Sequence, residues 1–89
     1  MNSISNSLPQ LQTLDIERNG YNVAFGELGL EWHWDSKTFA TLQSIAHGKG
    51  CVRHYLETQQ AHLLRAYDAD FLVDAIESRR SQFLGAMSN

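Results

Sequence analysis

The sequence predicts a small α+β domain, with a three-stranded antiparallel meander followed by three helices packed on one face. Two observations lead to this fold class. Apolar residues of the N-terminal third recur at every second position, as in half-buried strands. Those of the remaining chain recur at every third or fourth position, as in amphipathic helices. We expect residues 1–10 to form a flexible N-terminal tail and residues 11–89 to form the single domain.

The three expected strands lie between residues 11 and 35. Their alternating apolar residues are Leu14 and Ile16, then Tyr21, Val23 and Phe25, then Leu30, Trp32 and Trp34. Between the first two runs stands Asn19-Gly20, a pair that tolerates positive φ and is typical of a tight hairpin. The two indoles of the third run are expected in the core, because aromatic rings bury the largest area per residue.

The three expected helices follow the strands directly. The first ends at His47 before Gly48, with Asp35 or Ser36 as its N-cap. The second covers about residues 51–67, and the third begins near Asp68 or Asp70.

A break near Asp68 is expected because one straight helix would place two apolar stripes about 180° apart. These stripes are Leu56 with Leu63, and Leu72 with Ile76 and Phe83. A continuous helix would instead imply an intertwined dimer.

Composition narrows the function classes. The chain has 89 residues and a net charge of −3, and its seven bases are scattered, which disfavours nucleic-acid binding. Its one cysteine, Cys51, cannot form an internal disulfide, so a reducing, cytoplasmic environment is expected. No apolar run is long enough for a membrane span, and the first ten residues lack the pattern of a secretory signal.

Two groups of residues are candidate metal ligands. Glu31, His33 and Asp35 would share one face of the third strand and could hold a divalent cation, or orient the histidine as a base. A solvated outer face explains the same pattern more simply. Cys51 and His54 stand at i, i+3 on the second helix, as zinc ligands could. Cys51 at a helix start could alternatively be a reactive thiol, or simply a small buried side chain.

A helix-turn-helix can be fitted to residues 41–56, with Ala46 as the small residue and Gly50 as the turn glycine. Lys49 stands where an apolar residue is expected, and the second helix carries few bases, so this indication of DNA binding is weak.

The function that the sequence favours is a small non-enzymatic interaction module, acting as a regulator, adaptor or inhibitor. No catalytic grouping and no cofactor motif is present. Leu64, Val73 and Leu84 fall outside the expected core stripes and are the candidate interface for a homodimer or another protein. The alternatives are a metal- or small-ligand-binding protein and, more weakly, a DNA-binding regulator.

Overall fold

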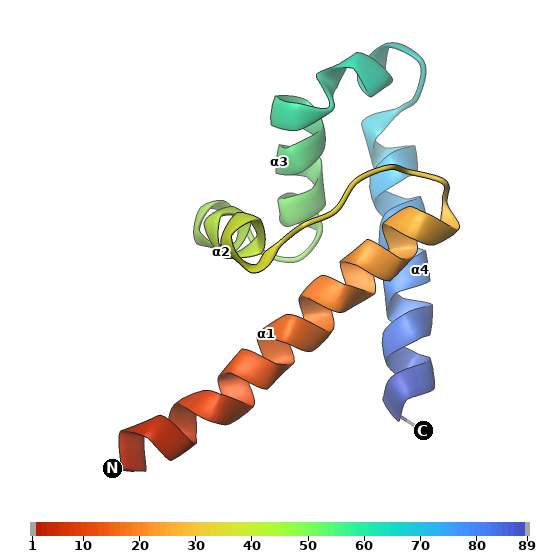
Figure 1. Cartoon of the computed structure of the whole chain (residues 1–89). Coiled ribbons are helices and arrows are strands. Elements are labelled where there is room, and N and C mark those ends of the chain that lie inside the picture. The colour runs from red at the N-terminus through yellow and green to blue at the C-terminus, as the bar shows by residue number, and fades with distance from the viewer. Residues whose placement is uncertain (1, 89) are drawn as a thin grey trace.

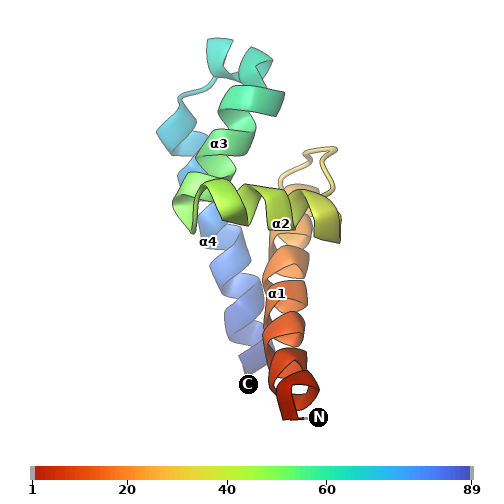
Figure 2. The same ribbon diagram turned by 90° about the vertical axis from the view of Figure 1, so that its left-hand side faces the viewer.

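A computed structural model describes the backbone of residues 2–88 and the side chains of residues 13–86. Over these residues the chain is all-helical and has no strand (Figure 1). The elements are α1 (Asn2–Glu27), α2 (Ser36–Ile45), α3 (Lys49–Gln59), the short 3₁₀ helix η1 (Ala61–Arg65) and α4 (Ala69–Ser88). α1 packs most extensively on α4, α3 also packs on α4, and α2 lies across the bundle (Figure 2).

The predicted α+β class, with its three-stranded meander, is therefore wrong. The residues expected in the first two strands lie in α1. There Tyr21, Ala24 and Phe25 are buried at i, i+3 and i+4, the spacing of a helical stripe. Tyr21 and Phe25, four residues apart, fit the period of two of a strand as well as the helical period. The pattern over residues 21–25 therefore did not distinguish a strand from a helix. The tail expected over residues 1–10 lies outside the residues whose side chains are described.

Gly20 shows why the predicted hairpin does not form. It lies inside α1 and faces α4, where a Cβ atom would approach Arg80 Cγ to 3.2 Å and carbons of Phe83 and Leu84 to 3.5 Å. This glycine allows the two helices to pass close together. Its small size, rather than its backbone freedom, is what this position requires.

The third expected strand is an extended loop between α1 and α2. Its backbone bonds to side chains of α1 instead of to a neighbouring strand. Asn22 Nδ2 donates to Trp34 O at 2.9 Å, and Trp34 N donates to Asn22 Oδ1 at 2.8 Å. Arg18 Nη1 also donates to Trp34 O, at 3.3 Å. The side chain of Asn22 thus bonds the backbone N–H and C=O of Trp34, which in a sheet would pair with a neighbouring strand.

The expected helical boundaries are confirmed at the start of α2 and at the break before α4. The expected ends are wrong, because α2 ends at Ile45 rather than at His47, and the second helix, expected to extend to about residue 67, ends at Gln59 before η1. Asp35 is the N-cap of α2, and its Oδ1 accepts a hydrogen bond from Thr38 N at 2.7 Å. This bond lowers the pKa of the Asp35 carboxyl. Gly48, at φ +56°, separates α2 from α3. The predicted break near Asp68 is also confirmed: α4 begins at Ala69, and Asp68 Oδ2 accepts from Phe71 N.

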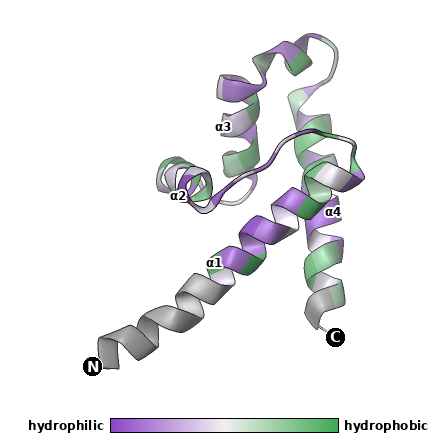
Figure 3. Cartoon of the chain, in the orientation of Figure 1, coloured by the Kyte–Doolittle hydropathy of each residue, from purple (hydrophilic) through white to green (hydrophobic). Residues whose placement is uncertain are grey.

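An aromatic cluster forms the centre of the core. Ring centroids lie 4.9–6.4 Å apart among its members. The members are Tyr21, Phe25, Trp32, Trp34, Phe39 and Tyr55. From α4, Val73 and Ile76 are buried in the same core, and apolar parts of α4 and of the end of α1 lie close together in Figure 3. In the described part of the chain, no helix combines the length and apolar character that a membrane crossing requires.

Candidate functional site

The first candidate site is a groove between α1 and α2, with a volume of about 700 Å³. Its lining residues come from both helices: Leu14, Asp15, Arg18, Ser36, Phe39, Ala40, Gln43 and Ser44. Phe39 is buried beneath it, whereas Leu14 keeps 44% of its surface exposed. We call this surface the α1–α2 groove. An accessible apolar surface of this kind is typical of a binding site.

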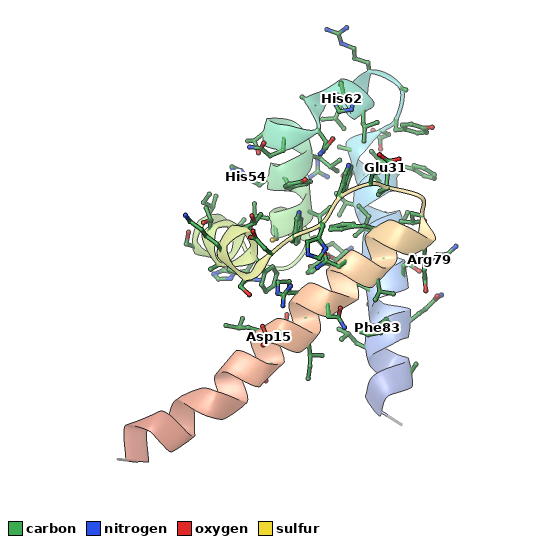
Figure 4. All side chains as sticks on the ribbon, viewed as in Figure 1. Asp15, Glu31, His54, His62, Arg79 and Phe83 are labelled. Carbon is green, nitrogen blue, oxygen red and sulfur yellow. The ribbon has the colours of Figure 1, made fainter. Side chains whose placement is uncertain are left out.

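Arg18 and Asp15 give the α1–α2 groove a charged edge on its α1 side. Figure 4 labels Asp15 on α1. Arg18 Nη2 lies 3.5 Å from Asp15 Oδ1, while Arg18 Nη1 is bonded to Trp34 O. Arg18 Nε is buried without a hydrogen-bond partner. The Asp15 side chain is 68% exposed, so its carboxylate remains available to a partner of opposite charge.

A buried polar cluster joins α1 to α4. The Tyr21 hydroxyl donates to Glu77 Oε2 at 2.8 Å, and Arg80 donates to Glu77 Oε1 through Nε at 3.0 Å and Nη2 at 2.8 Å. The Arg80 guanidinium also lies 5.0 Å from the centre of the Tyr21 ring. The charge of Glu77, only 8% exposed, is therefore balanced by a bidentate partner.

The ionisation of this cluster favours a structural role. Burial, and then the hydrogen bond to Glu77, raise the pKa of Tyr21 far above its ordinary value. Burial would lower the pKa of Arg80, but its bond to Glu77 and the neighbouring charges outweigh that effect and raise it. The tyrosine thus stays neutral and the arginine charged at physiological pH, and neither is poised to transfer a proton.

Cys51 lies in the core and is fully buried. Burial, together with the negative charge of Glu77, raises the pKa of its thiol to about 11. A reactive cysteine needs the opposite shift and access to solvent. Its surroundings are those of a small buried side chain, the simpler of the two interpretations of this residue.

The candidate metal ligands lie on two elements, the loop before α2 and helix α3. Glu31, His33 and Asp35 are exposed on the loop, whereas on α3 His54 is partly buried and Cys51 is in the core. Among the described residues, no group of three or more His, Cys, Asp or Glu is placed to hold a metal ion.

None of the three candidate interface residues is fully exposed. Leu64 is partly buried on η1, Val73 is 3% exposed in the core, and Leu84 is partly buried on α4 opposite Gly20. Their role in association stays a prediction. The α1–α2 groove was not predicted from the sequence, because Leu14 was placed on a strand. Leu14 and Arg18 stand at i and i+4, the spacing of neighbours on one helix face, and this spacing was the signal that could have indicated the groove.

The helix-turn-helix fitted to residues 41–56 coincides with the connection from α2 to α3. A Cβ atom at Gly50 would lie 3.2 Å from Ala46 Cβ, so these two positions do approach closely. Lys49 Nζ lies 3.6 Å from Asp74 Oδ1, and Arg53 pairs with Asp70. Acids of α4 therefore offset the bases of this segment.

Sequence comparison with curated proteins finds a partial relative of this chain. The chain is 27% identical, over 79 residues, to a protein of Cupriavidus necator named "Protein CbbY, plasmid". The similarity covers 89% of this chain but 30% of that protein, so the chain spans less than a third of its relative. No family model and no solved structure matches the chain.

Proposed function

We propose that this chain is a non-enzymatic helical interaction module, which binds an amphipathic helix of a second domain in the α1–α2 groove. The observation that carries the proposal is the groove itself: an apolar floor at Phe39 and Ala40, an exposed wall at Leu14, and a charged edge at Asp15 and Arg18. A helix laid in an apolar groove is a recurring mode of recognition, in which apolar residues one turn apart act as anchors.

The chemistry of the partner follows from the edges of the groove. Apolar side chains on the partner would cover Leu14 and Phe39, where burial of apolar surface supplies the binding energy. A lysine or arginine beside them would meet the exposed carboxylate of Asp15. We therefore expect a helix with an apolar face and a flanking base.

The relative supports a second domain as the partner. The similarity leaves 70% of the Cupriavidus necator protein without a counterpart in this chain, by subtraction of the matched 30%. In a CbbY-like protein the partner domain would then belong to the same polypeptide. Interfaces between domains of one chain resemble transient protein–protein interfaces and contain polar as well as apolar groups, as the lining of the α1–α2 groove does.

A chimera tests this proposal. The matching segment of the Cupriavidus necator protein is replaced by this chain, and backbone hydrogen exchange is compared between the chimera and the isolated chain. We expect slower exchange in the chimera around Leu14 and Ala40. Ala40→Glu, which places a charged side chain in the groove, should restore fast exchange there and lower the Tm of the chimera. It should leave the Tm of the isolated chain unchanged, because Ala40 is exposed in it.

Thr41→Glu is the matched control, since Thr41 is an exposed neighbour on α2 that does not line the α1–α2 groove. Equal exchange in the chimera and the isolated chain would refute the proposal. So would a dimer of the isolated chain, seen by native mass spectrometry, that Ala40→Glu dissociates, because the occupant would then be a second copy.

A further inference from the structure

A second groove lies on another side of α2, between α2, α3 and the preceding loop. It has a volume of about 540 Å³ and shares no lining residue with the α1–α2 groove. Its lining residues are His33, Lys37, Thr38, Thr41, Leu42, Ile45, His54, Tyr55, Thr58 and Gln59. We call it the α2–α3 groove. Figure 4 shows His54 on the side of α3 toward α2.

The lining of the α2–α3 groove contains one cation and two histidines. His33, Lys37 and His54 line it, and no acidic residue does. Five of the seven lysines and arginines form ion pairs in the described structure, and Lys37 is not among them. The acid next to the groove, Asp35, interacts electrostatically with His33 and Lys37, but Thr38 already donates hydrogen bonds to its carboxylate.

Apolar and aromatic side chains also line the α2–α3 groove. Ile45 is 56% exposed beside the buried Leu42. The Tyr55 ring is held in place by edge contacts with Trp32 and Trp34, at centroid distances of 5.4 and 5.2 Å. Apolar side chains combined with a few polar groups are the usual composition of a small-molecule site.

We propose that the α2–α3 groove binds a small amphiphilic oxyanion, an organic phosphate or carboxylate with an aromatic or aliphatic body. The anionic head lies among Lys37, His33 and His54, where charge-assisted hydrogen bonds are available. The body of the ligand covers Ile45 and the Tyr55 ring. This site is independent of docking in the α1–α2 groove, because the two surfaces share no residue.

Two-dimensional NMR of the isotope-labelled chain tests this site, with phenyl phosphate as the probe. We expect saturable shifts confined to the amides of Lys37, Thr41, His54 and Thr58. Benzoate should shift the same amides if the site accepts oxyanions in general, and failure of benzoate alone would overturn the carboxylate half of the proposal. Benzyl alcohol, which has the aromatic body without the charge, should give no saturable shifts.

Substitutions distinguish the site from general attraction of anions. Lys37→Gln and His54→Gln should each raise the Kd for phenyl phosphate about tenfold, from the loss of one charge-assisted bond. Arg65→Gln is the matched control, because Arg65 is another exposed base that does not line the groove. If Arg65→Gln weakens binding as much as Lys37→Gln, or if phenyl phosphate shifts no amide of the groove, the proposal is overturned.

Discussion

Asn22 holds the loop between α1 and α2, which carries Trp32 and Trp34, against α1. Its side-chain amide both donates to and accepts from the backbone of Trp34. The extended segment therefore needs no neighbouring strand, and the Trp34 side chain reaches the core with 0% exposure. Asn22, together with Arg18, thus satisfies the backbone of Trp34 without a neighbouring strand.

Asn22→Ala should lower the free energy of unfolding by about 1–3 kcal/mol, because Trp34 N–H loses its acceptor in a partly buried position. Trp34 O retains its bond from Arg18, which limits the loss. Urea unfolding, followed by circular dichroism, measures the effect. Asn19→Ala on the exposed side of α1 is the control, and equal destabilisation by the two variants would contradict this role of Asn22.

Tyr21 and Cys51 make the fold sensitive to alkaline pH. Both pKa values are raised in the folded state, so the stability that these groups contribute is fully present below their unfolded pKa values. For Cys51 it is lost as pH rises from its ordinary value of 9.0 toward about 11. For Tyr21 the loss begins above its ordinary value of 10.0. We therefore expect the unfolding free energy to fall as pH rises above 9.

Cys51→Ala separates the two contributions. The variant should lose less stability than the wild type between pH 9 and pH 11, by roughly 2–3 kcal/mol, which corresponds to the shift of the thiol pKa. Chemical denaturation at a series of pH values gives this slope independently of the baseline cost of the substitution. Parallel profiles for the two proteins would show that the thiol does not contribute.

At the scale of elements, the points where α2, α3 and α4 begin were predictable, whereas the ends of α2 and α3 were not. Asp35 before α2, Gly48 before α3 and Asp68 before α4 mark boundaries through local hydrogen bonds or backbone angles. α1 was not predictable in the same way, because Asn19-Gly20 is a hairpin signal in isolation. Only the approach of α4 explains the glycine, and that approach involves residues some 60 positions away.

Gly20 and Gly26 allow a direct test of this close crossing, since both lie in α1. Gly20→Leu should destabilise the protein by about 1–3 kcal/mol or more, because its side chain would overlap Arg80 and Phe83. Gly26→Ala should stabilise it by up to about 0.5–1 kcal/mol, because nothing lies within 4 Å of its Cβ and alanine favours the helix. Thermal unfolding of both variants measures the difference. A neutral Gly20→Leu would mean that the helices do not pass this closely.

At the scale of the whole molecule, both candidate grooves depend on contacts between distant segments. The α1–α2 groove brings Leu14 next to Phe39, and the α2–α3 groove brings Lys37 next to His54. His33 and His54 were recognisable from the sequence as residues with chemistry, but their shared groove was not, because no local period relates a loop to a helix. The wrong strand assignment placed Leu14 and Trp34 in one sheet. With Leu14 on a strand, the α1–α2 groove could not be predicted.

Trp34 gives the last prediction, because it connects most of the molecule. Its ring contacts Tyr21 and Phe25 of α1, Phe39 of α2 and Tyr55 of α3. Trp34→Leu should therefore lower the unfolding free energy by about 2–4 kcal/mol through lost burial and an incompletely filled cavity. A domain of this size has only about 5–15 kcal/mol in total, so a measurable unfolded fraction is expected at moderate temperature.

Trp32→Leu is the matched control, since Trp32 is only partly buried and contacts Phe25 and Tyr55 alone within the aromatic cluster of the described residues. We expect it to cost clearly less than Trp34→Leu in urea unfolding. Circular dichroism should show the two variants with the same helical content when folded, because neither indole belongs to a helix. If the two substitutions cost the same, the aromatic cluster has no single centre, and the loop rather than Trp34 joins the helices.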